Sequence, residues 1–144
     1  MAEMNPHELA FVEAFVQPAR RERAAFCLSN PKKRPEFINK FAHHGRDVLI
    51  PQHLKSIDPS HQNPKSIYAL LHSLGAPSTC HVISTRIGGD EIELLSALEQ
   101  VVGCGLGTVI SCIPGRLAYF EGEWKERFIL ERSQHQLLQN PPFH

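Results

Sequence analysis

Residues 103–112, GCGLGTVISC, place three alternate glycines and two cysteines in the most apolar part of the 144-residue chain. Glycine-rich loops bind phosphate when a strand leads through them into the N-terminus of a helix, where free N–H groups meet the anion. Here the expected order is reversed, because an apolar helical pattern precedes Gly103 and a β-branched run follows Gly107. We therefore expect a helix cap followed by the start of a central strand.

The cysteines raise the question of a metal or thiol site. Zinc sites favour ligand pairs at short spacing, such as Cys-x2-Cys, and no two cysteines have that spacing. Cys80 and His81 are neighbours and would point to opposite faces of a strand, so they cannot pair with each other. They could meet Cys104 or Cys112 if their strands are adjacent. We expect reduced thiols that pack as small apolar side chains, and no metal or cofactor.

A second pattern, Glu123-Trp-Lys125, has the Glu-x-Lys form in which a strand carries a metal-binding carboxylate and a lysine. Asp90 could supply an upstream acid. A metal-dependent hydrolase or nuclease that uses Asp90, Glu123 and Lys125 is therefore one alternative function. The competing interpretation is an exposed charged turn, because residues 121–124, EGEW, are typical of a hairpin bend.

Residues 20–34 contain a basic cluster with Glu22 as its only acid. The cluster consists of Arg20, Arg21, Arg23, Lys32, Lys33 and Arg34. Such clusters can neutralise the phosphates of nucleic acid, so nucleic-acid binding is a second alternative function. No recognised nucleic-acid motif accompanies the cluster, and a solvated helical face would give the same pattern.

The segment 117–124, LAYFEGEW, carries aromatic side chains that could contact a protein partner. If helices cover one face of the sheet, alternation leaves some of these side chains on the other face or at the edge. Exposed aromatic residues beside arginines are typical of protein interfaces. We predict a partner-binding surface of Tyr119, Phe120, Trp124, Arg20, Arg21 and Arg23. The alternative is that the N-terminal helices cover the aromatic residues as part of the core.

The elements that would position these side chains follow from apolar periodicity and turn residues. Helical patterns cover residues 6–16, 20–28, 35–45, 64–74 and 90–102. Short β-branched or alternating runs predict strands over residues 80–85, 107–113, 117–121 and 126–131. The segment 47–62 has two prolines and little periodicity, and it is expected to be a long loop.

These elements predict a single α+β domain over residues 1–132, followed by a loose tail over 133–144. A helical N-terminal half would pack on one face of a small, mainly antiparallel four-stranded sheet that the C-terminal half forms. One domain is expected because a chain of this length can bury one core, and the composition, 42% apolar and 21% charged, is ordinary for a globular protein.

Charge and hydropathy restrict the function further. The formal net charge is zero, so no overall field recruits nucleic acid or an anionic membrane. The first residues are acidic where a secretory signal is basic, and the longest apolar run, 101–115, is shorter than the roughly 20 residues that cross a bilayer. We expect a soluble, cytoplasmic protein without membrane partners.

The sequence contains no evident catalytic triad, cofactor fingerprint or metal-ligand spacing. The favoured hypothesis is therefore a small soluble interaction or regulatory module without catalytic activity. Its protein partner is unknown, and a homodimer through a sheet edge or through the hairpin is one form that the interaction could take.

Overall fold

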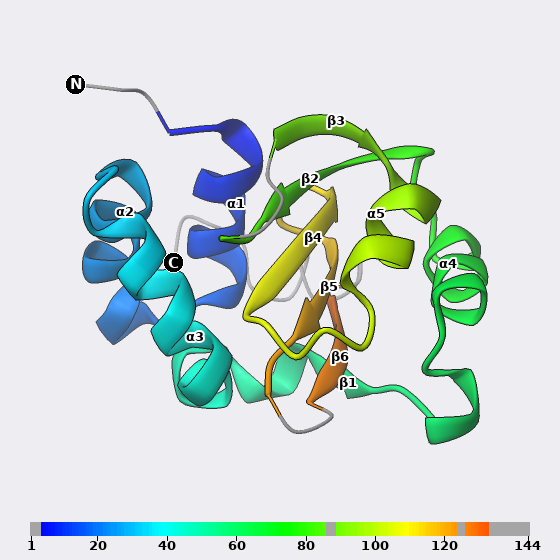
Figure 1. Ribbon diagram of the computed structural model, residues 1–144. Helices are drawn as coiled ribbons and strands as arrows, with labels where there is room; N and C mark the ends of the chain where they lie inside the picture. The colour runs from blue at the N-terminus through cyan, green and yellow to red at the C-terminus, as the bar shows by residue number, and fades with distance from the viewer. Residues whose placement is uncertain (1–3, 86–88, 124–125, 133–144) are drawn as a thin grey trace.

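The computed structural model describes residues 4–85, 89–123 and 126–132. Within these ranges the chain forms five α-helices and a six-stranded antiparallel sheet, so the expected α+β class is confirmed. Figure 1 shows the sheet in the middle of the molecule, with α1, α2 and α3 on one side and α4 and α5 on the other. The fold therefore has three layers, with helices covering both faces of the sheet.

The bounds of the elements are as follows. The helices are α1 (Pro6–Phe15), α2 (Arg21–Ser29), α3 (Arg34–Val48), α4 (Pro64–Ser73) and α5 (Leu94–Val101). The strands are β1 (Leu54–Ser56), β2 (Thr79–Ile83), β3 (Gly89–Glu93), β4 (Thr108–Ile113), β5 (Leu117–Glu121) and β6 (Arg127–Glu131). A short 3-10 helix, η1 (Pro18–Arg20), precedes α2. No helix in the described ranges has the length and apolar character that crossing a bilayer requires.

The sheet has six strands where the sequence predicts four. Its order is β1-β6-β5-β4-β2-β3. Residues 54–56, inside the expected loop, pair with β6, and residues 89–93, at the start of the expected 90–102 helix, pair with β2. Both extra strands are short and lie at the edges of the sheet, where pairing with a neighbour rather than a local apolar pattern stabilises them.

The helices also cover both faces of the sheet rather than one, which gives two hydrophobic cores. Tyr119 and Phe120, neighbours on β5, point to opposite faces, and both are 0% exposed. The prediction that these two residues form an exposed partner surface is therefore wrong, because each face of the sheet is covered by its own layer of helices. Trp124 lies outside the described residues.

The helix α3 lies close against the sheet because glycine occupies two contact points. A Cβ on Gly107 would lie 2.5 Å from the carbonyl oxygen of Ile38, and a Cβ on Gly45 would overlap the ring of Phe120. Gly45, the expected end of this helix, is instead buried inside it, and the helix continues to Val48 after a local kink at His44. Glycine here permits close packing rather than a stop.

Candidate functional site

The glycine-rich loop lies between α5 and β4, in the order that the sequence predicts. Gly103 (φ +92°) and Gly105 (φ +70°) have left-handed backbone conformations, which favour glycine. Their N–H groups donate to the carboxylate of Glu121, at 3.0 Å to Oε1 and 2.8 Å to Oε2. The loop thus binds an anion, but the anion is a side chain of the same molecule.

The Glu121 carboxylate, 1% exposed, has two further contacts. The Tyr119 hydroxyl donates to Oε1 at 2.7 Å, and Nε of Arg127 lies 3.5 Å from the same oxygen. Burial, followed by the Glu121 charge, raises the pKa of Tyr119, so the phenol stays protonated and donates. These contacts fix the loop to the end of β5, and both glycine N–H groups are already engaged.

Cys80 and Cys112 line one cavity of about 310 Å³ near the N-terminus of α1, whereas Cys104 is exposed. Burial raises the pKa of Cys80 to about 12 and also raises the pKa of Cys112, on which the nearby Cys80 acts in the same direction. Both thiols are protonated near neutral pH and are poor nucleophiles. Among the described residues, no three His, Cys, Asp or Glu side chains are placed to hold a metal ion.

His81 belongs to a buried polar network rather than to a cysteine site. Its Nε2 lies 2.7 Å from Oε2 of Glu8, and its Nδ1 lies 3.3 Å from Oδ1 of Asp90. Arg34 donates two hydrogen bonds to Glu8, of 2.5 and 2.7 Å. Burial alone would raise the pKa of Glu8, but the hydrogen bonds from Arg34 and His81 outweigh it and lower the pKa to about 2. The ionised carboxylate can only accept, so Nε2 of His81 carries the proton.

His7 extends this network to β4. Its Nδ1 lies 2.8 Å from Oγ of Ser111, and its ring stacks on His81 with centroids 5.6 Å apart. Burial, followed by the neighbouring His81, lowers the pKa of His7, so the imidazole is neutral at pH 7. A hydroxyl beside a neutral imidazole resembles a nucleophile with its base, but Ser111 is only 2% exposed and is closed off from a substrate. The network therefore serves to join α1 and α3 to the sheet.

The residues of the hydrolase hypothesis do not converge. Asp90 on β3 contacts His81, whereas Oε2 of Glu123 lies 2.7 Å from Nδ1 of His43. In Figure 1, β3 lies at the top of the molecule, whereas β5 ends toward the bottom, two residues before Glu123. Lys125 lies outside the described residues. Two carboxylates in separate clusters cannot bind one metal ion.

Two members of the basic cluster have internal partners. Nε of Arg21 donates to the carbonyl oxygen of Val16 at 2.9 Å, and Arg34 is paired with Glu8. These contacts hold the start of α2 to the end of α1 and the start of α3 to α1. Arg21 therefore has a structural contact, whereas Arg20 and Arg23 line a groove.

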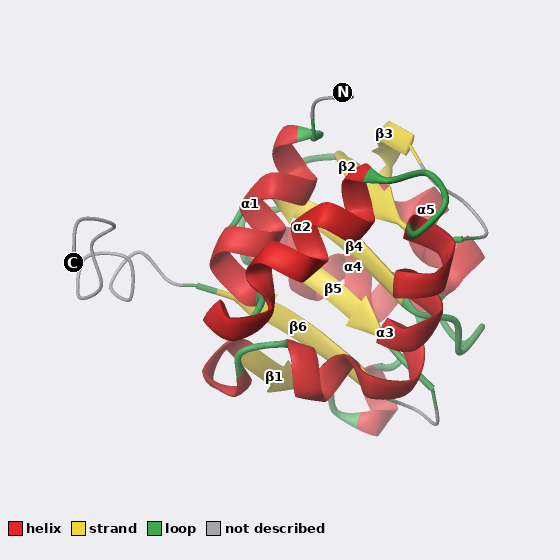
Figure 2. Ribbon diagram, turned by 90° about the vertical axis from the view of Figure 1, so that its left-hand side faces the viewer, coloured by secondary structure: helices red, strands yellow, loops and turns green. Residues whose placement is uncertain are grey.

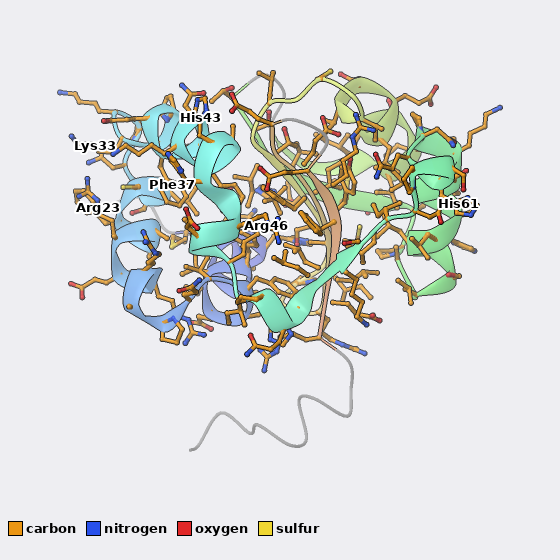
Figure 3. All side chains as sticks on the ribbon, turned by 90° about the horizontal axis from the view of Figure 1, so that it is seen from below. Arg23, Lys33, Phe37, His43, Arg46 and His61 are labelled. Carbon is orange, nitrogen blue, oxygen red and sulfur yellow. The ribbon has the colours of Figure 1, made fainter. Side chains whose placement is uncertain are left out.

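This groove, of about 370 Å³, lies between α2 and α3. Figure 2 shows the two helices side by side in the helical layer that faces the viewer, and Figure 3 shows Arg23, Lys33 and Phe37 together on this side of the molecule. Its cationic lining consists of Arg20, Arg23, Lys33 and Lys40. Its apolar lining consists of Cys27, Phe37, Phe41 and Val48. The groove thus combines positive charge with apolar contact surface.

The charge of this groove is only partly balanced. Glu36 and Asp47 also line it, so four cations and two carboxylates leave a formal charge of +2 with His44 neutral. Asp47 lies 3.8 Å from Nδ1 of His44. Within the described ranges, no carboxylate lies within ion-pair distance of the four cations. As far as the structure describes the chain, an external anion would therefore not have to displace a carboxylate that is paired with these cations.

Phe37 and Phe41 form an aromatic wall of the groove. They lie one turn apart on α3, with ring centroids 6.1 Å apart and planes inclined by 26°. Phe41 is 4% exposed and packs edge-on against Phe11 and Phe120 in the core. Across the groove, the guanidinium of Arg23 lies 5.6 Å above the ring of Phe26. Both contacts restrict the movement of the groove side chains.

No protein-family model, curated protein or solved structure matches this chain. The candidate site therefore depends on the geometry alone. Sequence reasoning missed Phe37 and Lys40 as site residues. The signal that could have found them is their spacing from Lys33, since positions four and seven residues along a helix share a face.

Proposed function

We propose that this protein is an interaction or regulatory module that binds an anion in the groove between α2 and α3. The observation that carries the proposal is the convergence of Arg20, Arg23, Lys33 and Lys40 on one cavity, with no carboxylate at ion-pair distance from them in the described part of the chain. Like charges that crowd together repel each other, and a bound anion removes this repulsion.

The two walls of the groove supply different donors. Arg20 and Arg23 come from η1 and α2, and Lys33 and Lys40 come from the α3 side. An arginine can donate two parallel hydrogen bonds to a carboxylate or phosphate, whereas a lysine supplies a compact charge. The four cations are exposed side chains, and the apolar residues of the lining add contact surface for the uncharged part of a ligand.

Titration of the ¹⁵N-labelled protein with inorganic phosphate, followed by NMR, tests this proposal. We expect amide shift changes in η1, α2 and α3, because the cations that bind phosphate lie on these elements. The double substitution Arg23→Glu and Lys40→Glu should abolish the changes. The matched control is Lys65→Glu, which changes an exposed lysine on α4, across the sheet.

Two results would overturn the proposal. One is the absence of shift changes in η1, α2 and α3, and the other is their persistence after the charge reversal. A single-stranded oligonucleotide titrated in parallel tests the nucleic-acid alternative. If it binds through the same residues more tightly than phosphate does, and loses affinity steeply with salt, the partner is a nucleic acid.

A further inference from the structure

We infer that the ligand of the groove is a small aromatic anion, in which one carboxylate, sulfonate or phosphate group is attached to a flat ring. This inference rests on the proposed function and adds the chemical class of the ligand. Three features of the groove lead to it: its size, the position of its aromatic wall among the cations, and the two carboxylates in its lining.

The size of the groove suits a compact molecule. Its volume of about 370 Å³ falls near the lower end of pockets that hold small ligands, roughly 300 to 1,000 Å³. A ring with one charged substituent fits this space, whereas an extended polymer would place only one unit in it.

The aromatic wall lies among the cations. Phe37 on α3 is four residues after Lys33, the N-cap residue of this helix, and three residues before Lys40, so the three residues follow one side of the helix. Arg23 lies on the opposite wall. A ligand whose ring stacks on Phe37 therefore has its anionic substituent within reach of cations from both walls.

The packing of Phe41 behind Phe37 favours a ligand with a flat ring over one with a flexible chain. Phe41 is held in the core by Phe11 and Phe120, and Phe37 stacks on it. A wall that is already fixed offers a planar surface without loss of side-chain freedom on binding. Planar rings gain from offset stacking on such a surface, which saturated rings of similar size do not.

The carboxylates in the lining limit the charge of the ligand. Glu36 and Asp47 reduce the formal charge from +4 to +2, so the groove balances no more than two negative charges, a limit that one carboxylate, sulfonate or phosphate group does not exceed. A polyanion such as a nucleic-acid backbone would bring further phosphates against these carboxylates. Repulsion of this kind provides selectivity against the wrong ligand.

Benzoate and cyclohexanecarboxylate form a matched pair of probes, since they have the same charge and similar size but only one is flat. In NMR titrations of the 144-residue chain, we expect benzoate to bind at least about threefold more tightly, because stacking adds to simple burial. Burial alone would favour the saturated ring, which is the more apolar of the two. Equal or tighter binding of cyclohexanecarboxylate would overturn the aromatic class.

Variants distinguish the proposed anion binding in the groove from the further inference that the ligand is aromatic. Phe37→Leu should weaken benzoate about fivefold and weaken inorganic phosphate clearly less, because phosphate has no ring to stack, whereas Tyr68→Leu on α4 should weaken neither. Dispersed amide spectra establish that each variant is folded, and the comparison of the two probes on the natural sequence needs no variant. If phosphate binds but benzoate shows no preference, only the aromatic class fails. If neither phosphate nor benzoate binds, the proposed function fails as well.

Discussion

Glu8 on α1 and Arg34 in the first turn of α3 form a two-point ion pair, with N–O distances of 2.5 and 2.7 Å. Arg34 also donates to the carbonyl oxygen of Leu28 at 3.0 Å, near the end of α2. One guanidinium thus links three helices at the point where α2 turns into α3. These two helices form the walls of the groove, and the hydrogen bond from Arg34 to Leu28 joins them at one end.

Replacing Glu8 with Gln keeps the size of the side chain but removes its charge. Arg34 and His81 then lose their shared ionic partner inside the protein. We expect the free energy of unfolding to fall by about 3 kcal/mol, as when one member of a buried ion pair is removed. Urea denaturation at pH 7 measures this change. The control Glu13→Gln, at an exposed position of the same helix, should stay within about 0.5 kcal/mol of the natural protein. Equal effects of the two substitutions would contradict the claim that Glu8 belongs to a stabilising buried ion pair.

The same carboxyl should govern stability in acid. The pKa of Glu8 is lowered from 4.5 to about 2, so its contribution to stability is complete above about pH 4.5 and is lost as the pH falls toward 2. Melting temperatures measured from pH 7 to pH 2 should therefore decline more steeply for the natural protein than for Glu8→Gln over the acidic part of this range. Parallel curves would show that Glu8 has an ordinary pKa in the folded state.

Local signals in the sequence predicted the starts of α1 and α4, at Pro6 and Pro64. The side chains of Asn5 and Asn63 accept hydrogen bonds from His7 and Ser66, as their positions before a proline suggest. The edge strands β1 and β3 were missed because polar residues such as Lys55 dominate them, and only pairing with β6 or β2 makes them strands.

The sequence predicted only some residues of the candidate site, for a related reason. Charge density along the chain identified Arg20 and Arg23, but the groove also needs Phe37 and Lys40 from α3, and their role depends on α2 packing against that helix. The glycine loop shows the same limit, since its direction was predicted correctly while its ligand, Glu121, lies 16 residues beyond Gly105.

The substitution Glu121→Ala tests whether the Glu121 carboxylate holds the glycine-rich loop through the N–H groups of Gly103 and Gly105. This substitution leaves two backbone N–H groups and the buried Tyr119 hydroxyl without their acceptor, so we expect a loss of about 3 kcal/mol in the free energy of unfolding. Hydrogen exchange at the amides of Gly103 and Gly105 should become faster. Glu123→Ala removes a carboxylate that pairs with the exposed His43, and its effect should stay below about 1 kcal/mol. Unchanged exchange at both glycines would show that Glu121 does not hold the loop.

Thiol accessibility follows from burial. Under native conditions a disulfide reagent such as dithionitrobenzoate should react rapidly with one thiol, that of Cys104, because Cys27, Cys80 and Cys112 are buried. Cys104→Ser should remove the rapid phase, and all remaining thiols should react after unfolding in guanidinium. Rapid reaction of a second thiol in the native protein would contradict this expectation, and it would show that the cavity lined by Cys80 and Cys112 or the groove lined by Cys27 admits the reagent.

The four cations of the groove have no ion-pair partner among the described residues, and this predicts a conflict between the stability of the free protein and its anion binding. Lys40→Gln removes one of four positive charges that repel each other, so the ligand-free protein should gain up to about 0.5 kcal/mol in stability while its affinity for phosphate falls. The gain should shrink as salt screens the repulsion, because the Debye length drops from about 10 Å at 0.1 M to about 3 Å at 1 M ionic strength. Lys65→Gln on α4 changes the same kind of side chain outside the groove and should alter neither quantity. If Lys40→Gln lowers stability at every salt concentration, Lys40 is a structural residue, and its place among the binding cations would have to be given up.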